Sequence, residues 1–239
     1  MGEVNQLCKT GVEVLNKDFL DSPVVRQKKE ELERKKFSLV SKFLFDKFVS
    51  IILLGILSPI FLILAVLIKL EDGGSVFYRQ ERVTTNGRIF KIFKFRTMIE
   101  NADKKGSLVT LQNDSRITRI GSFIRNYRLD EVPQLLNVLI GDMSFVGTRP
   151  EVVKYVEQYT EEMKTTLLLP AGVTSLASIE FKDEDKLIKH YMTEEMEVDE
   201  IYVTKILPKK MNPNIAYINS FSIFEDIKIM IRTVIAVLK

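Results

Sequence analysis

The sequence predicts an α/β fold that is mostly helical, with a small β-hairpin and a membrane-embedded helix. Three observations support this: an apolar run at 48–68, two strand-like segments around Asn86-Gly87, and apolar residues at helical spacing in most of the remainder. A length of 239 residues suits one sizeable domain rather than two. We therefore expect a compact domain on a membrane anchor, divided into a charged extension at 1–41, a membrane helix at 42–70 and the domain itself at 71–239.

Composition limits the chemistry that the chain can perform. The single cysteine, Cys8, cannot form an internal disulfide, and the single histidine, His190, cannot build a multi-histidine metal site. A bound metal would therefore need oxygen ligands, which favours magnesium. The net charge is only +3, but basic residues gather around the apolar run, which indicates an anionic membrane surface rather than nucleic acid. The first forty residues lack the apolar core of a signal peptide, so we expect a cytoplasmic domain.

The highly charged segment at 24–36 predicts a helix in solvent, which would act as a tether to the apolar run. The run spans about 21 uncharged residues, enough to cross a bilayer. Ser58-Pro59 lies at its midpoint, where proline removes a backbone hydrogen bond and predicts a kink, and where the serine can cover freed backbone groups. A re-entrant helix is slightly favoured over a kinked span, because both flanks of the run are basic. These flanking residues are Lys28, Lys29, Arg34, Lys35, Lys36, Lys42, Lys47, Lys69, Arg79, Arg82 and Arg88.

A β-hairpin is predicted after the membrane segment. Residues 75–83 and 88–98 are rich in β-branched and aromatic side chains, and Asn86-Gly87 between them is a typical hairpin turn. In the second arm Lys91, Lys94 and Arg96 alternate with apolar residues. An ordinary amphipathic strand and an anion-binding site explain this basic strip equally well.

Apolar residues at helical spacing predict helices in most of the remaining chain. Arginines at 116, 119, 125 and 128 are set among apolar residues over 114–128, and Asp130 stands where the N-cap of a further helix, ending at Gly141, would lie. Helices are also expected at 151–168 and 183–204. The final stretch, 222–239, is amphipathic, and core packing and interfacial membrane binding fit it equally well.

Asp130 and Glu131 are the leading candidates for chemistry. Adjacent acids more often mark a solvated helix start than an active site. Here Arg125 lies about one helical turn upstream, and tight turns after the following helix can bring Arg149 back towards the acids. A positive helix end and guanidinium groups would keep a carboxylate ionised. Such a carboxylate can attack phosphorus, while its neighbour can hold a magnesium ion.

Several ordered motifs resemble the bacterial sugar transferase family, the monotopic phosphoglycosyl transferases. The resemblance covers roughly residues 40–155, with a weaker echo in the closing helix. The motifs are the segment 42–59, the sequence FYRQERV at 77–83, KFRTM at 94–98, RITRIG at 116–121, and LDEVPQLLNVLIGDMSFVGTRPE at 129–151.

The resemblance implies that a UDP-sugar gives its sugar 1-phosphate to undecaprenyl phosphate, with release of UMP. This reaction would start bacterial surface glycan synthesis, of the exopolysaccharide, lipopolysaccharide or capsule type, on the cytoplasmic face of the bacterial inner membrane. Its partners are the UDP-sugar, undecaprenyl phosphate and the lipid bilayer, with no nucleic acid; a homodimer stays open.

The resemblance also assigns roles to individual residues. It implies a re-entrant membrane helix broken at Ser58-Pro59, a covalent phosphosugar intermediate on Asp130, and Mg²⁺ bound by Glu131. Arg125 and Arg149 match positions that contact phosphate. Arg96, from the basic strip, is a further candidate for phosphate binding.

The sequence also departs from the family pattern. Thr148 stands where proline is usual, and Arg128 where a small residue is usual. The segment 169–175 replaces a motif expected to shape the donor pocket, and 205–216 has the character of an insertion. Two other functions stay open: a membrane-anchored scaffold of a glycan assembly complex without catalysis, and a membrane phosphohydrolase with water as acceptor.

Overall fold

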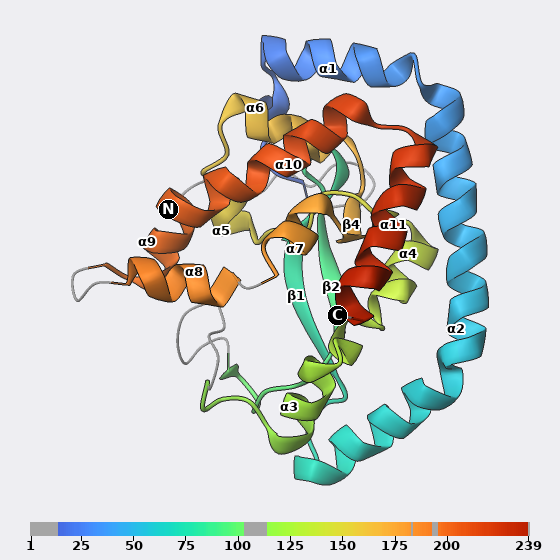
Figure 1. Cartoon of the computed structure of the whole chain (residues 1–239), viewed down its shortest axis with the longest axis vertical. Coiled ribbons are helices and arrows are strands. Elements are labelled where there is room, and N and C mark those ends of the chain that lie inside the picture. The colour runs from blue at the N-terminus through green and yellow to red at the C-terminus, as the bar shows by residue number, and fades with distance from the viewer. Residues whose placement is uncertain (1–13, 103–113, 183, 193–195, 239) are drawn as a thin grey trace.

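The computed structural model describes residues 14–102, 114–182, 184–192 and 196–238. A β-hairpin occupies the middle of the molecule, short helices surround it, and a long helix, α2, runs along one side (Figure 1). The predicted fold class is confirmed in its coarse form, since the described chain is mostly helical with small sheets.

The elements follow one another in chain order. The helices are α1 (Pro23–Glu33), α2 (Lys36–Asp72), α3 (Arg119–Asn126), α4 (Gln134–Ile140), α5 (Val153–Val156), α6 (Glu161–Lys164), α7 (Leu176–Glu180), α8 (Glu184–Tyr191), α9 (Val198–Ile201), α10 (Leu207–Ser220) and α11 (Ile223–Leu238). Single turns lie at η1 (Lys17–Leu20), η2 (Thr85–Gly87), η4 (Leu129–Glu131), η5 (Thr165–Leu168) and the π-helical η6 (Tyr202–Ile206). The strands are β1 (Phe77–Val83), β2 (Ile89–Phe95), β3 (Met143–Val146) and β4 (Ala171–Thr174).

The hairpin prediction is confirmed. Strands β1 and β2 pair antiparallel from Phe77 opposite Phe95 to Val83 opposite Ile89. Because side chains alternate along a strand, the hairpin has two distinct faces. The aromatic face packs on α2, where the ring of Phe61 lies 4.8 Å from that of Phe95. The opposite face carries Tyr78, Gln80, Arg82 and Lys94, which line a cavity.

Helix α2 is one continuous helix that contains Pro59 and bends along its course (Figure 1). Proline at position 59 has no N–H for the carbonyl of Gly55, and the Ser58 hydroxyl donates to that oxygen at 2.8 Å. The break implied by the family resemblance is therefore a bend within an intact helix. The helix also extends beyond the expected range of 42–70 at both ends. Its length and composition would allow it to cross a membrane.

Both ends of α2 pack against the same domain. Near its start, the Lys42 ammonium donates to Asp226 on α11 at 2.7 Å and to the carbonyl of Val146 at 2.8 Å. Near its end, Leu64 and Ile68 are buried against the hairpin and α3. The middle of the helix leaves large apolar side chains exposed, among them Phe48, Ile52, Ile56 and Leu62.

Helix α1 corrects the interpretation of residues 24–36 as a solvated tether. The segment is helical as predicted, and Ser22 caps it by accepting a hydrogen bond from the Val25 N–H at 3.3 Å. Val25 and Leu32 are buried, however, and the Lys35 ammonium donates to the Phe221 carbonyl at 2.8 Å. Two apolar positions in a charged segment are thus enough to dock it on the domain.

The C-terminal half is more broken than its spacing predicts. The expected helix at 151–168 is divided into α5, α6 and η5, because Thr160 caps a new helix by accepting from the Met163 N–H. The apparent insertion at 205–216 is part of the main core through Met211. Core packing of the last helix is confirmed at Ile229, which is buried, whereas Phe224 and Val234 on α11 are exposed, and binding of this face to a membrane stays a prediction.

Candidate active site

The two candidate carboxylates lie on the turn η4, between α3 and α4. The prediction that Asp130 caps the following helix is wrong, because α4 begins only at Gln134. Asp130 instead lies inside the 3₁₀ turn, whose first flanking residue, Arg128, has a left-handed backbone (φ 53°). A left-handed conformation is costly for a residue with a side chain, which accounts for the small residue expected at this position.

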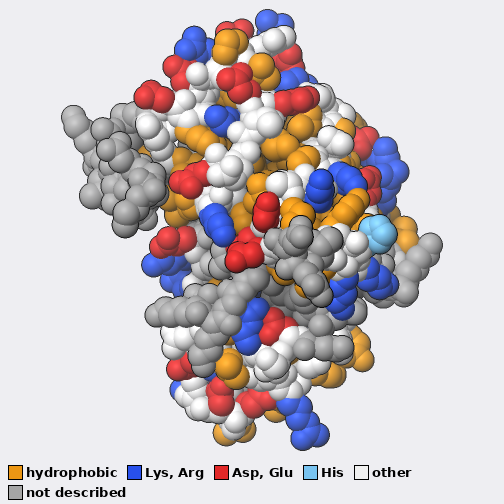
Figure 2. All heavy atoms as spheres, turned by 90° about the vertical axis from the view of Figure 1, so that its left-hand side faces the viewer, with side chains coloured by type: hydrophobic (Ala, Val, Ile, Leu, Met, Phe, Trp, Pro, Cys, Tyr) orange, Lys and Arg blue, Asp and Glu red, His pale blue; other side chains and the backbone are white. Residues whose placement is uncertain are grey.

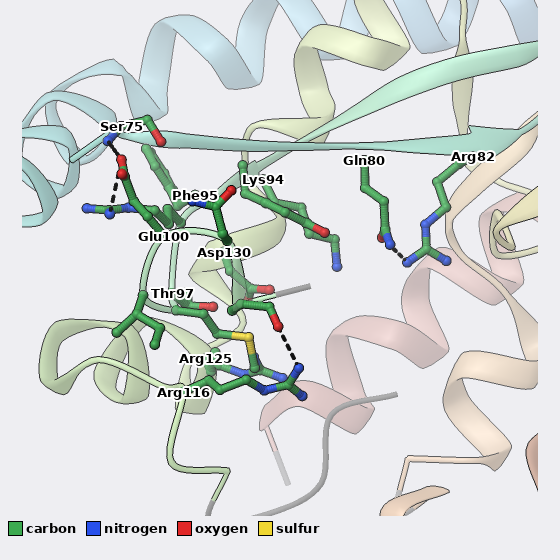
Figure 3. Close-up of a pocket in the computed structure, with 16 residues that line it drawn as sticks. Ser75, Gln80, Arg82, Lys94, Phe95, Thr97, Glu100, Arg116, Arg125 and Asp130 are labelled. Carbon is green, nitrogen blue, oxygen red and sulfur yellow. Dashed lines mark hydrogen bonds and ion pairs between the residues drawn. The ribbon is translucent and has the colours of Figure 1, made fainter. Parts of the chain in front are cut away.

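Asp130 opens onto a cavity of about 390 Å³, a size typical of small-ligand sites. The cavity lies between the polar face of the hairpin, the loop after β2, and α3 (Figure 3). Its lining is strongly cationic, with the side chains of Arg82, Lys94, Arg96, Arg116 and Arg125. Such a surface is suited to a ligand with several negative charges.

Glu131 is held by two cations. Lys94 donates to Glu131 Oε1 at 3.0 Å, and the Arg149 guanidinium spans both carboxylate oxygens, with Nη1 at 3.4 Å from Oε2. Burial raises the pKa of Glu131, but the charges of Arg149 and Lys94 outweigh it and hold that pKa far below its usual range. Glu131 is therefore an ionised, fixed carboxylate at any physiological pH.

Asp130 has the opposite electrostatic character. Burial raises the pKa of Asp130, Lys94 opposes this rise, and the neighbouring charge of Glu131 adds to it. Cations therefore lower the pKa of Glu131, whereas at Asp130 burial outweighs them and raises the pKa. A poorly solvated carboxylate with a raised pKa is a better nucleophile than an exposed one. The structure therefore distinguishes two acids that are adjacent in sequence.

The three predicted phosphate-binding arginines have different environments. Arg125 lines the cavity with Asp130, and its side chain makes no ion pair with any described residue. Arg149 forms an ion pair with Glu131 and does not line the cavity. Arg96 lines the cavity and pairs with Asp72 at the end of α2, while its Nε and Nη1 atoms have no hydrogen-bond partner among the described residues.

Four residues of the hairpin form part of the site without having been predicted as its members. Lys94 was expected in a basic strip but without a partner, and Tyr78, Gln80 and Arg82 were not expected to lie near Asp130. The signal was present, since positions 78, 80 and 82 share one face of a strand. What was missing was the packing that directs this face towards η4.

The segment 169–175 has a different role from the one expected. Strand β4 pairs in parallel with β3, and no residue of the segment lines the cavity at Asp130. The two backbones approach so closely that a Cβ on Gly172 would lie 2.2 Å from the Gly147 nitrogen. The segment therefore supports, from behind, the turn that carries Arg149.

Thr148 lies in that turn and replaces the usual proline. Its side chain is buried, and its hydroxyl has no hydrogen-bond partner among the described residues. We predict that Thr148→Val raises the free energy of unfolding by about 1 kcal/mol, because valine keeps the shape and removes an unsatisfied hydroxyl. Thermal unfolding would measure this, with Thr204→Val as the control, because Thr204 is exposed on η6 and its hydroxyl donates to the Glu200 carbonyl at 2.8 Å. A less stable Thr148→Val would show that the hydroxyl has an unseen partner.

Magnesium was expected at Glu131. No cluster of three acidic, histidine or cysteine side chains able to hold a metal occurs in the described part of the chain. The carboxylate pair still offers oxygen donors of the kind that Mg²⁺ prefers, and the only hydrogen bond to Glu131 Oε2 from the described residues is the long one from Arg149. Residues 130 and 131 therefore fit a metal whose other ligands are phosphate oxygens and water.

Comparison with known proteins agrees with this arrangement. A family model described as bacterial sugar transferase matches residues 37–239. The exopolysaccharide production protein ExoY of Sinorhizobium fredii is 35% identical over 213 residues, which cover 83% of this chain and 85% of that protein.

Two further relatives are longer. A UDP-N-acetylgalactosamine-undecaprenyl-phosphate N-acetylgalactosaminephosphotransferase of Aeromonas hydrophila is 34% identical over 81% of this chain and 42% of its own length. A UDP-glucose:undecaprenyl-phosphate glucose-1-phosphate transferase of Klebsiella pneumoniae is 36% identical over 82% and 40%. The chain thus spans about two fifths of these two relatives. Its motifs, its site and these matches show that the chain belongs to the bacterial sugar transferase family.

Proposed function

We propose that the protein is a phosphoglycosyl transferase that moves a sugar 1-phosphate from a UDP-sugar to undecaprenyl phosphate and releases UMP. The observation that carries this proposal is a poorly solvated carboxylate, Asp130, in a cationic cavity beside an unpaired arginine, Arg125. The names of the relatives from Aeromonas and Klebsiella supply the class of donor and acceptor. Starting a surface glycan is the cellular role that this reaction would serve.

The reaction would proceed in two displacements at one phosphorus atom. An Asp130 oxygen attacks the phosphorus that bears the sugar, the bond to the bridging oxygen breaks, and UMP leaves with that electron pair. An oxygen of the lipid phosphate then attacks the same phosphorus and releases the Asp130 carboxylate. Arg125 and Lys94 stabilise the negative charge that is spread over the phosphoryl oxygens in both steps.

Glu131 would hold Mg²⁺ through its less occupied oxygen, Oε2. When bound, the metal neutralises the charge of the donor's diphosphate. Arg149 and Lys94 fix the position of the Glu131 carboxylate and limit the repulsion between it and Asp130.

Assay of UMP release from a panel of UDP-sugars, with magnesium and undecaprenyl phosphate, tests the function. We expect release that requires all three components. Release without the lipid would favour the phosphohydrolase, and no release with any donor would favour the scaffold. Retention of Asp130, Glu131, Arg125 and Arg149 around one site speaks against the scaffold.

The same proposal extends to membrane topology. Both ends of α2 are anchored on one domain, and its exposed middle is apolar, which supports a re-entrant helix. Phe123 on α3, Tyr127 directly after α3 and Phe224 on α11 would add interfacial contacts. On the face turned away from α2, charged side chains of both signs are visible among hydrophobic and other ones (Figure 2). We place this domain on the cytoplasmic side of the bacterial inner membrane.

Cysteine labelling tests the topology. In a Cys8→Ser background, Glu30→Cys before α2 and Glu81→Cys after it should both react with a membrane-impermeant reagent from the cytoplasmic side only. Ile56 is exposed on the apolar middle of α2, which the proposal places in the membrane, so Ile56→Cys is the control and should not react. Labelling of positions 30 and 81 from opposite sides would establish a spanning helix.

A further inference from the structure

The cavity extends away from Asp130 in two directions. In Figure 3, Ser75 and Glu100 lie at one end, Gln80 and Arg82 lie at the other, and Asp130 lies between them. Ser75 and Arg82 are seven positions apart along an extended chain, which corresponds to roughly 23 Å. A nucleoside diphosphate sugar has its reacting phosphorus between its sugar and its nucleotide. Bound at Asp130, it would therefore extend towards both ends.

The end at Ser75 is rich in acceptors. Glu100 Oε1 accepts from the Ser75 N–H at 3.3 Å and lies 3.9 Å from Arg96 Nη1. Asp72 also pairs with Arg96, so two carboxylates face one guanidinium. The two carboxylates repel a phosphate, whereas the hydroxyls of a sugar can donate hydrogen bonds to a carboxylate.

Arg96 lines the same end of the cavity. Its side chain is 7% exposed, its Nε and Nη1 atoms are buried, and the carboxylates of Asp72 and Glu100 balance its charge. The Glu100 side chain is 59% exposed, so its carboxylate is the acceptor that the hydroxyls of a sugar ring would meet, and Arg96 holds it in place.

The end at Gln80 has a different chemistry. Arg82 Nη2 donates to the Gln80 side-chain oxygen at 2.6 Å, which fixes the amide and leaves its N–H groups available towards the cavity. Arg82 Nη1 donates to the Pro150 carbonyl at 3.0 Å and lies 3.9 Å from Glu151 Oε2, so one carboxylate faces this guanidinium, against two at Arg96. A guanidinium beside an amide is suited to a phosphate and to the carbonyl edge of a pyrimidine base.

We propose that Arg96 and Glu100 form the subsite that recognises the donor's sugar, and that Gln80 and Arg82 bind its nucleotide. This assignment rests on the proposed function, because it takes a UDP-sugar as the ligand. It orients the donor along the polar face of the hairpin. It also places sugar recognition against Asp72, the last residue of the membrane helix.

Calorimetric titration of the full chain in nanodiscs tests the assignment, with UMP, UDP-glucose and UDP-galactose as probes. Glu100→Gln should change the ratio of the two sugar affinities by about tenfold, because a lost acceptor affects one epimer more than the other. Its affinity for UMP should stay within about twofold. Gln80→Ala should weaken UMP and both sugars alike by about tenfold, with their ratio unchanged. Glu81→Gln, an exposed change of the same kind on the other face of β1, is the control.

Two outcomes would overturn the assignment. If Glu100→Gln loses affinity for UMP while the ratio of its affinities for UDP-glucose and UDP-galactose is unchanged, the nucleotide binds at the Glu100 end and the sugar at the Gln80 end. Unchanged binding of all three probes in both variants would show that the donor does not bind in this cavity. Since the titration reports binding and not transfer to the lipid, a wild-type protein that binds the UDP-sugars without releasing UMP would refute the transferase and still test the subsite.

Discussion

Asp130→Asn is expected to reduce sugar-phosphate transfer by about 10³-fold or more, because an amide cannot attack phosphorus as a carboxylate does. The same change should not destabilise the protein. Burial raises the pKa of Asp130, so the carboxyl group favours the folded state while protonated and opposes it once ionised. A neutral amide of the same shape removes this cost, and the advantage of the variant in stability should grow as the pH rises through the raised pKa.

Two measurements on the same preparation check this prediction. UMP release reports the activity, and thermal unfolding at acid and at neutral pH reports the stability. Asp21→Asn, an exposed residue paired with Arg26, is the matched control and should change neither. Near-normal turnover by Asp130→Asn would refute the covalent intermediate. A variant that is less stable at neutral pH would show that ionised Asp130 is satisfied by its surroundings.

Asp226→Ala is expected to lower the free energy of unfolding by about 3–5 kcal/mol and to reduce activity as well. The ammonium of Lys42 and the carboxylate of Asp226 are 2.7 Å apart, with side chains 4% and 8% exposed. Removing the carboxylate leaves a buried cation without its partner and takes the acceptor from the Tyr217 hydroxyl, now at 2.6 Å. Activity should suffer because Lys42 also binds the carbonyl of Val146, three residues before Arg149.

A compensating variant separates this pair from a general loss of packing. Lys42→Met with Asp226→Leu should recover most of the stability, since apolar residues often replace a buried ion pair without loss. The Tyr217 hydroxyl can then turn to the Val146 carbonyl, already 3.5 Å away. Glu225→Ala, which breaks the exposed Lys228 pair, should cost less than about 1 kcal/mol. An Asp226→Ala cost no larger than this control would contradict the prediction. Chemical denaturation in one detergent would compare all three variants.

The sequence alone determined the features that depend on neighbouring residues. Asn86-Gly87 predicted a hairpin, and both residues have the left-handed backbone that the turn requires. Gly141 ends α4 for the same reason, with φ at 93°. Pro59 removes one known hydrogen bond, so the location of the bend in α2 could be predicted. The long ordered motifs identified the family in the same way, because each is read within a short stretch of chain.

The tertiary structure decided which distant residues meet. Arg149 holds Glu131 across 18 positions, and Lys42 holds Asp226 across 184. The turns after α4 indicated that Arg149 could return towards the two acids, but not which acid it would hold, and no spacing linked Lys42 to Asp226. Packing, and not local backbone geometry, brings these side chains together.

Burial also separated the adjacent acids. Asp130 and Glu131 have nearly the same chemistry in sequence, yet one faces the cavity with a raised pKa and the other is fixed between two cations. A pKa depends on solvent exposure and on nearby charge, and both are properties of the folded chain. The sequence therefore determined the location of the chemistry, and only the fold assigned each carboxylate its environment.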